Sequence, residues 1–306
     1  MNRIDGSPMH ALGQFGFGLL AISLAVPVLA QAPAAPSQAT TAHTEPALNL
    51  IRDVVYNETH TPDRDQRWEY RSERVTPEKH EVREQVETSQ GTVFRVVQQN
   101  GAPLDESQRQ QEEQRIEQTI QDPSALARVE REHHDDEERL IRALELLPQA
   151  MLFEYQGAPQ DGLATIAFRP NPAYSASGFE PRIVHALTGT VLVDTRSKRL
   201  IEIRGTVAER VDFGFGMIGH LEKGGSFAIH RRHLADGAWK TDVVDVHVAG
   251  KLLLLKSFCK DQRETRSDFR PVPGGITLAQ AKEMLDAAAG EIAQMSLLPA
   301  TLPTSR

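Results

Sequence analysis

KRLIEIRGTVAERVDF, residues 198–213, is the stretch that decides the fold. Charged residues fill most of its even positions, and apolar residues fill most of its odd positions, which is typical of a strand with one buried face. A slip of one residue would expose every apolar side chain, so the pattern specifies the register. Glu209 breaks the pattern, and it either reaches water at the rim of the strand or contacts a ligand in a cavity. The apolar odd positions are Ile201, Ile203, Val207, Val211 and Phe213.

Segments of similar length lie on both sides of this stretch. In 66–75, Trp68 and Tyr70 alternate with charged residues, which again indicates a sheet that is wet on one side. Short breaks such as Asp161-Gly162 and Ala249-Gly250 are typical of hairpins. We therefore expect a mainly β (α+β) chain, with a curled antiparallel sheet or incomplete β-barrel of about ten strands. The other predicted strands are 79–88, 91–99, 150–156, 163–169, 184–195, 226–234, 239–249, 252–259 and one near 263–269.

Three regions have helical spacing instead. Residues 47–56 place apolar side chains on one face of a short helix. An insertion at 104–147 holds 13 acidic and 6 basic residues, and a break at 122–124 divides it into two acidic helices. Thr277 and Gln280 have the spacing of a capping box, which predicts a C-terminal helix to about residue 295.

The amino terminus predicts export from the cytoplasm. Residues 12–30 are apolar and end in an A-x-A site, so we interpret 1–32 as a cleaved signal peptide, with cleavage after Ala30 or Ala32. The alternative is an uncleaved membrane anchor. Because no cysteine follows the apolar run, we expect no lipid attachment, and a mature protein that is periplasmic or secreted. Residues 33–46 are a predicted linker, 47–295 a single β-rich domain, and 296–306 a flexible tail.

Charge and cysteine content exclude several function classes. A net charge of −8 provides no basic footprint for nucleic acid. The single cysteine, Cys259, excludes an intramolecular disulfide and a cysteine-based zinc cluster, and we expect it to be a packed strand residue.

Several motifs resemble catalytic or metal sites without meeting their requirements. Residues 214–219 match G-x-G-x-x-G, but another strand follows where a dinucleotide site needs a helix, so we predict a hairpin loop. His133 and Glu137 share a helical face, which is either a pair of metal ligands or a solvated surface. Residues 230–233 alternate across a strand and predict a charged outer surface. We find no G-x-S-x-G motif, and we expect no catalytic residue, metal or cofactor.

Residues 187–194 (LTGTVLVD) and 198–203 (KRLIEI) resemble a strand pair of the outer-membrane lipoprotein-sorting carriers, the LolA and LolB-like superfamily. The order of elements over 47–270 is similar as well. The resemblance implies an incomplete barrel whose concave apolar face holds acyl chains beneath a helical lid. It implies lid residues Leu140, Leu144 and Leu147. The implied ligand-binding residues are Trp68, Tyr70, Phe153, Tyr155, Ile201, Ile203, Val207, Val211 and Phe213.

Two functions are consistent with these observations. The first is a periplasmic carrier or sensor that binds a lipid, a lipoprotein acyl chain or another apolar molecule without chemistry. The second is a cell-envelope interaction module with a filled core, whose acidic helices bind a partner. For the carrier we expect transient contact with membrane-bound envelope proteins. An elongated apolar groove under a helix favours the first function, and a fully packed interior favours the second.

Overall fold

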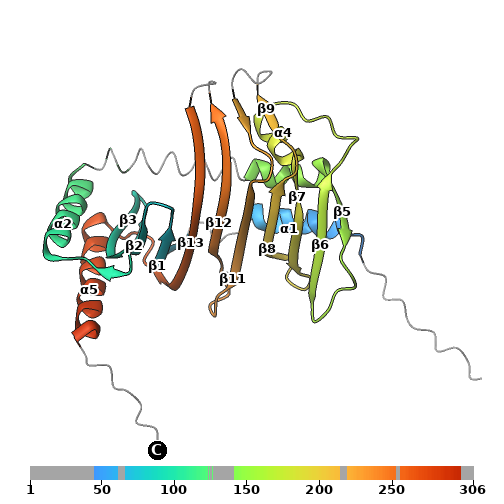
Figure 1. Cartoon of the computed structure of the whole chain (residues 1–306). Helices are drawn as coiled ribbons and strands as arrows, with labels where there is room; N and C mark the ends of the chain where they lie inside the picture. The colour runs from blue at the N-terminus through green and yellow to red at the C-terminus, as the bar shows by residue number, and fades with distance from the viewer. Residues whose placement is uncertain are drawn as a thin grey trace, which may run out of the picture. The chain divides into compact units, whose positions relative to one another are not determined.

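A large antiparallel sheet organises the molecule (Figure 1). The computed structural model describes residues 45–60, 66–122, 124, 126, 141–213, 219–252 and 256–297. The spatial order of the strands is β4-β3-β2-β1-β13-β12-β11-β8-β7-β6-β5, with β10 pairing β12 and β9. The strands are β1 (Arg67–Val75), β2 (His80–Thr88), β3 (Gly91–Gln99), β4 (Ala102–Pro103), β5 (Met151–Tyr155), β6 (Leu163–Pro170), β7 (Leu187–Asp194), β8 (Arg199–Val207), β9 (Val211–Phe213), β10 (Gly219–Leu221), β11 (Ser226–His233), β12 (Trp239–Leu252) and β13 (Lys256–Val272).

The predicted fold class is confirmed. Within the described residues the chain is mainly β, and its sheet is antiparallel and open, with β4 and β5 at the ends of the strand order. The predicted strand boundaries are less accurate. The stretch 198–213 forms two strands, because β8 ends at Val207 and β9 begins at Val211. Glu209 lies between them and is exposed to water. Of the strand predicted at 252–259, Leu252 ends β12 and residues 256–259 belong to β13, which also contains the strand predicted at 263–269.

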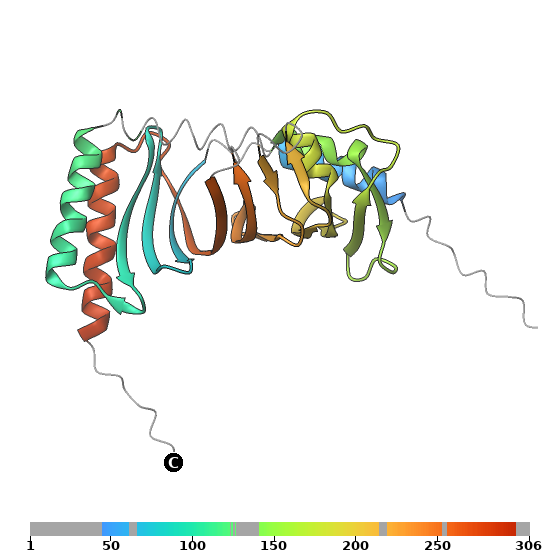
Figure 2. The same cartoon turned by 45° about the horizontal axis from the view of Figure 1, so that its top comes forward.

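Helices lie at both ends of the sheet (Figure 2). The helices are α1 (Ala47–Thr59), α2 (Glu106–Gln121), the helical segment 141–150, α4 (Phe179–His185) and α5 (Leu278–Leu297). α2 ends at the predicted break, and Thr277 and Gln280 form the predicted capping box before α5. The sequence pattern missed α4, because its seven residues are fewer than the window of about 11 residues over which a helical period can be recognised.

The helices at the two ends cover opposite faces of the sheet. Directly paired residues of neighbouring strands share a face, and the pairing Ile203↔Ile229↔Val244↔Glu264↔Arg74 follows one face across β8, β11, β12, β13 and β1. We call this the α1 face, because α1 packs on Ile203. Val86 and Val93 have the other parity and pack with α5. We call their side the α5 face.

A β-bulge corrects part of the predicted apolar face. Leu192 pairs with Glu202, but the next residue, Val193, pairs with Leu200, so Ile201 is the extra residue on β8. A bulge changes the alternation on one side of itself. Leu200 and Ile203 are therefore buried, whereas Ile201 is only half-buried. The alternation predicted for β8 is correct from Ile203 to Val207 and wrong at Ile201.

Two glycines let β7, β8 and β11 approach closely beneath Phe227. Gly189 pairs with Gly205, and Gly205 pairs with Phe227 on the other side. A methyl group on Gly205 would lie 2.8 Å from the Phe227 ring, and one on Gly189 would overlap the carbonyl oxygen of Arg204. The ring of Phe227 therefore occupies the space that a side chain on Gly205 would need.

We expect Gly189→Ala to lower the free energy of unfolding by about 2–3 kcal/mol, because the added methyl forces β7 away from β8. Gly274→Ala is the matched control, since a methyl group there meets no atom of the structure within 4 Å. Urea denaturation of the two variants measures the difference. Equal stability of the two variants would contradict the close approach described for Gly189.

Candidate functional site

The apolar side of α1 packs on the α1 face of β5, β6, β7 and β8. Its Leu50, Ile51, Val54 and Val55 are buried against this sheet. Leu144 and Leu147 of the segment 141–150 pack on the same cluster and are half-buried. Between helices and sheet lies a cavity of about 20 Å³, close to the volume needed for a single water molecule. Its lining is Ile51, Val54, Val55, Glu58, Leu144, Leu147, Phe153, Phe168, Val191, Leu200 and Ile203.

The predicted ligand-binding residues do not form one surface. Ile203, Phe153 and Tyr155 belong to the cluster beneath α1. The resemblance implies one continuous ligand-binding face. In the structure the predicted residues belong to separate apolar clusters, because different helices and turns pack on different parts of the strands. Val207, Val211 and Phe213 pack instead with Ala186, Leu221 and Ile183 around α4. Trp68 and Tyr70 form a third cluster with Ala238, Leu234 and Phe269.

Of the predicted lid residues, Leu144 and Leu147 cover the cavity beneath α1. Leu140 lies outside the described residues, as do the predicted signal peptide 1–32, the metal-ligand candidates His133 and Glu137, and most of the predicted linker and tail.

A buried carboxylate fixes the carboxyl-terminal part of α1 to the sheet. The side chain of Glu58 is only 3 % exposed. Its Oε1 accepts hydrogen bonds from Arg199 Nε and from the backbone N–H of Leu200, both at 3.0 Å. Arg231 of β11 forms an ion pair with Oε2. Burial lowers the pKa of Arg231 to about 10, so this guanidinium stays charged at neutral pH.

Trp239 of β12 contacts both arginines, Arg231 from the neighbouring strand β11 and Arg199 from β8, one strand further away. The guanidinium of Arg199 lies 5.7 Å from the centre of the Trp239 ring, and Arg231 Nη2 donates a hydrogen bond of 2.8 Å to the Trp239 carbonyl. Sequence reasoning missed this cluster, because Glu58 is more than 140 residues from both arginines. It also corrects the prediction that 230–233 is an outer surface, since Arg231 is mostly buried.

Exposed polar groups hold the solvent-facing side of α1 and the residue Glu45 that precedes it. Lys198, in the turn between β7 and β8, forms ion pairs with Asp53 and Glu45, and Asn57 Nδ2 donates to the Lys198 carbonyl at 3.1 Å. Tyr155 Oη donates to the Glu45 carbonyl at 2.9 Å. Exposed ion pairs of this kind stabilise little, so the apolar cluster and Glu58 account for most of the attachment of α1.

The Trp68 cluster combines aromatic rings with buried charge. Lys240 Nζ lies 4.5 Å from the centre of the Trp68 ring, and the backbone N–H of Trp68 donates to Glu87 at 3.1 Å. Burial raises the pKa of Glu87 above its usual value of 4.5, although Lys240 and the Trp68 N–H oppose the shift. The folded protein therefore holds this proton more tightly than the unfolded chain does.

A raised carboxyl pKa makes stability fall as the pH rises from 4.5 through the folded-state pKa, because the unfolded chain releases the proton first. We expect Glu87→Gln to remove this part of the pH dependence, so the variant gains stability relative to wild type as the pH increases. Urea denaturation at a series of pH values measures the gain. Glu117→Gln changes the same charge at an exposed position of α2 and serves as the control. Parallel curves for wild type and Glu87→Gln would contradict the prediction.

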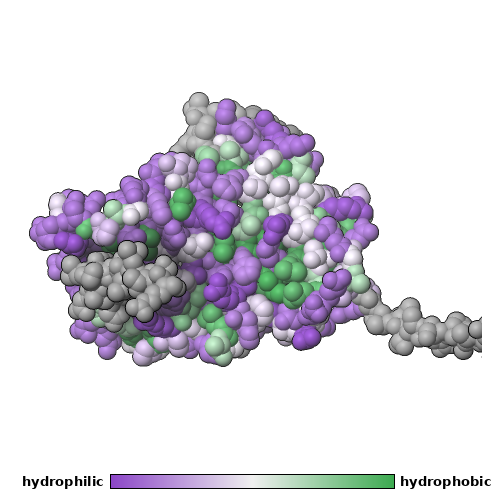
Figure 3. Space-filling view, turned by 60° about the horizontal axis from the view of Figure 1, so that its bottom comes forward, coloured by the Kyte–Doolittle hydropathy of each residue, from purple (hydrophilic) through white to green (hydrophobic). Residues whose placement is uncertain are grey.

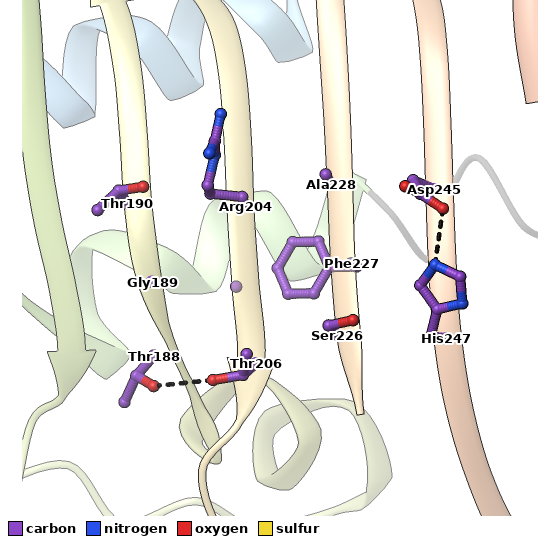
Figure 4. Close-up of a pocket in the computed structure, with 11 residues that line it drawn as sticks. Thr188, Gly189, Thr190, Arg204, Thr206, Ser226, Phe227, Ala228, Asp245 and His247 are labelled. Carbon is purple, nitrogen blue, oxygen red and sulfur yellow. Dashed lines mark hydrogen bonds and ion pairs between the residues drawn. The ribbon is translucent and has the colours of Figure 1, made fainter. Parts of the chain in front are cut away.

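The α5 face carries an open trough of about 450 Å³ over β7, β8, β11 and β12 (Figure 4). Thr188 and Thr206 are within 3.4 Å of each other on neighbouring strands. His247 contacts Asp245 at 2.8 Å and Asp261 at 2.7 Å, and the hydrogen bond to Asp261, helped by Asp245, raises the pKa of His247. These polar side chains thus pair with one another, both within β12 and between neighbouring strands.

Other sequence candidates have structural explanations. β9 and β10 pair antiparallel around residues 214–218, as expected for a hairpin and not for a dinucleotide site; those five residues lie outside the described ones. His230 and Arg232 both contact Asp242, at 2.5 and 2.9 Å. Cys259 lies on β13 as predicted but is exposed, so the prediction of a packed residue is wrong. Its alternation on β13 places it on the α5 face, which is open there.

Three general observations complete the description. The described residues contain no group of three or more His, Cys, Asp or Glu placed to bind a metal ion. Among the helices that the structure describes, none is long and apolar enough to cross a bilayer. In the view of Figure 3, hydrophilic residues dominate the surface and apolar ones form separate patches. The exposed large apolar residues Tyr56, Val75, Leu163 and Phe179 come from four different elements.

Comparisons with protein-family models, with curated proteins and with solved structures gave no match to this chain.

Proposed function

We propose that this protein is a non-enzymatic, carrier- or sensor-like binding protein that takes up an apolar chain between the α1 face and the helices that cover it. The observation that supports the proposal is the composition of the cavity beneath α1, where ten of the eleven lining residues are apolar and only Glu58 is charged. Such a lining, with one polar group that fixes orientation, is typical of sites for apolar ligands. In this proposal the protein acts in the periplasm or outside the cell, as its amino terminus predicts.

Uptake requires that the covering helices move, since the present cavity of about 20 Å³ is much smaller than an acyl chain. The segment 141–150 is the weaker cover. Its leucines are half-buried, and its described polar contacts include the exposed pair between Arg142 and Glu180 at 3.3 Å and the hydrogen bonds that Asn171 donates to the carbonyls of Gln149 and Ala150, at 3.1 and 2.9 Å. α1, by contrast, has buried apolar residues and the Glu58 cluster. We therefore assign the role of the lid to the segment 141–150.

Native mass spectrometry with added oleyl alcohol and oleate tests the proposal. We expect a one-to-one complex, and we expect the double variant Leu144→Ala/Leu147→Ala to take up either compound about tenfold faster, because a cover weakened by about 1.4 kcal/mol opens ten times more often. Leu163→Ala removes the same side-chain atoms at an exposed position and is the control. No mass increase with either compound, in wild type or in the double variant, would refute uptake.

The second candidate function, an interaction module with a filled core, is favoured by the small size of the cavity. The acidic groups of α2 support it less, because several of them are used within the chain. The buried Glu112 accepts a hydrogen bond of 2.8 Å from the backbone N–H of Val96 on β3, outside the part of β3 that pairs with the two-residue strand β4. Glu113 pairs with Arg95 at 2.9 Å and with Lys282 at 2.5 Å. These contacts cover a sheet edge that would otherwise invite pairing with another chain.

A further inference from the structure

Glu58 and the residues around it have the arrangement of a bound anionic headgroup. One carboxylate is held by two guanidinium groups and a backbone N–H, and charge-assisted bonds of this type are the usual means of recognising carboxylates and phosphates. The carboxylate lines the same cavity as Ile51, Val54 and Val55. Those apolar residues precede it on one side of α1 and form a stripe about 6 Å long.

The groups that hold the Glu58 carboxylate belong to the sheet, and both arginines also contact Trp239 there. Arg199 lies on β8 against the Trp239 ring, and Arg231 lies on β11 with its guanidinium bonded to the Trp239 carbonyl. The N–H of Leu200 belongs to the bulged part of β8. Within the described part of the chain, the buried Nε of Arg231 has no hydrogen-bond partner. The sheet therefore holds two cations and an N–H donor at the end of an apolar face.

We infer that α1 occupies its own binding site as an internal substitute for the ligand, and that the ligand is an amphiphile with one anionic headgroup, a carboxylate or a phosphate, on an apolar chain. The inference rests on the proposed function and adds the chemical class of its ligand. In the bound state the headgroup replaces Glu58 between Arg199 and Arg231, and the apolar chain lies on the sheet beneath α1, where the apolar residues of α1 pack in the present structure. Competition between Glu58 and the headgroup sets the affinity.

Calorimetric titration with oleate, and with uncharged oleyl alcohol, tests the inference. Glu58→Gln keeps an acceptor oxygen but removes the competing charge, so it is expected to bind oleate about tenfold more tightly than wild type does, with less than about threefold change for oleyl alcohol. Asp53→Asn removes a charge from the exposed side of the same helix and is the control, with equal effects on both compounds. Acetate tests the headgroup alone and is expected to bind far more weakly than oleate.

Arg231→Gln gives an independent measurement if Glu58→Gln does not fold, since the pair of Glu58 with Arg199 remains. It is expected to abolish the preference for oleate over oleyl alcohol. Equal gains for both compounds in Glu58→Gln, or an unchanged preference in Arg231→Gln, would overturn the headgroup assignment while leaving apolar uptake intact. Binding of neither compound by any of the proteins would overturn both the proposed function and this inference.

Discussion

Trp68→Ala is expected to lower the free energy of unfolding by about 3–5 kcal/mol, which is the usual cost of removing a fully buried tryptophan. Trp68 is 1 % exposed, and its ring packs at right angles on Phe269, with centroids 6.3 Å apart. Leu234 and Ala238, from the turn between β11 and β12, complete the cluster. The loss of the ring leaves a cavity between β1, β13 and this turn, so the centre of the sheet becomes the weak part of the protein.

Thermal and urea denaturation, monitored by circular dichroism, measure this loss. Tyr56→Ala removes another large aromatic side chain, but Tyr56 is 61 % exposed, and surface substitutions usually change stability by less than about 0.5 kcal/mol. A Trp68→Ala variant as stable as Tyr56→Ala would show that the Trp68 cluster does not stabilise the sheet.

Glu58→Ala is expected to cost about 3–5 kcal/mol, because removing one member of a buried ionic cluster leaves the charges of Arg199 and Arg231 without their partner. The same helix provides the control. Asp53→Ala breaks the ion pair with Lys198, in which both side chains are more than one third exposed, so we expect little change in the denaturation midpoint. Equal effects of the two substitutions would mean that Glu58 is not the main polar attachment of α1.

A double-mutant cycle tests whether Glu58 and Arg231 interact directly in the native state. If Glu58→Ala/Arg231→Met lowers the free energy of unfolding by less than the sum of the losses in the two single variants, the two side chains interact. Additive costs would indicate that the two side chains stabilise the protein independently.

The sequence pattern was sufficient to predict the sheet but not how its residues are divided among clusters. Alternation is a local property, so β8 and the antiparallel class followed from the sequence. The bulge at Ile201 depends on the register with β7, since Val193 pairs with Leu200, and no pattern within β8 encodes it. The end of β8 at Val207 likewise depends on the contacts of the residues that follow it. Glu209 is exposed because it lies in the connection between β8 and β9.

The candidate site was predictable only in part. Ile203, Leu144 and Leu147 have the spacing of buried faces, and they lie together beneath α1. Trp68, Tyr70, Val207, Val211 and Phe213 have equally apolar patterns but belong to other clusters, because pattern shows that a residue is buried without showing what it packs against. Glu58 lies beyond the end of the predicted helix 47–56, and no pattern in the sequence singles it out. Its role depends on two arginines that only the folded sheet brings to it.

In the proposed function an apolar chain enters between α1 and the sheet. Photo-crosslinking with a fatty acid that carries a diazirine in its chain locates this chain, because its adducts can be mapped by peptide mass spectrometry. We expect adducts on Ile51 to Val55 and on Val191, Leu200 and Ile203, and their loss when unlabelled oleate is in excess. Adducts confined to the opposite face, at Thr188, Thr206 and Ser226, or no adducts at all, would contradict it.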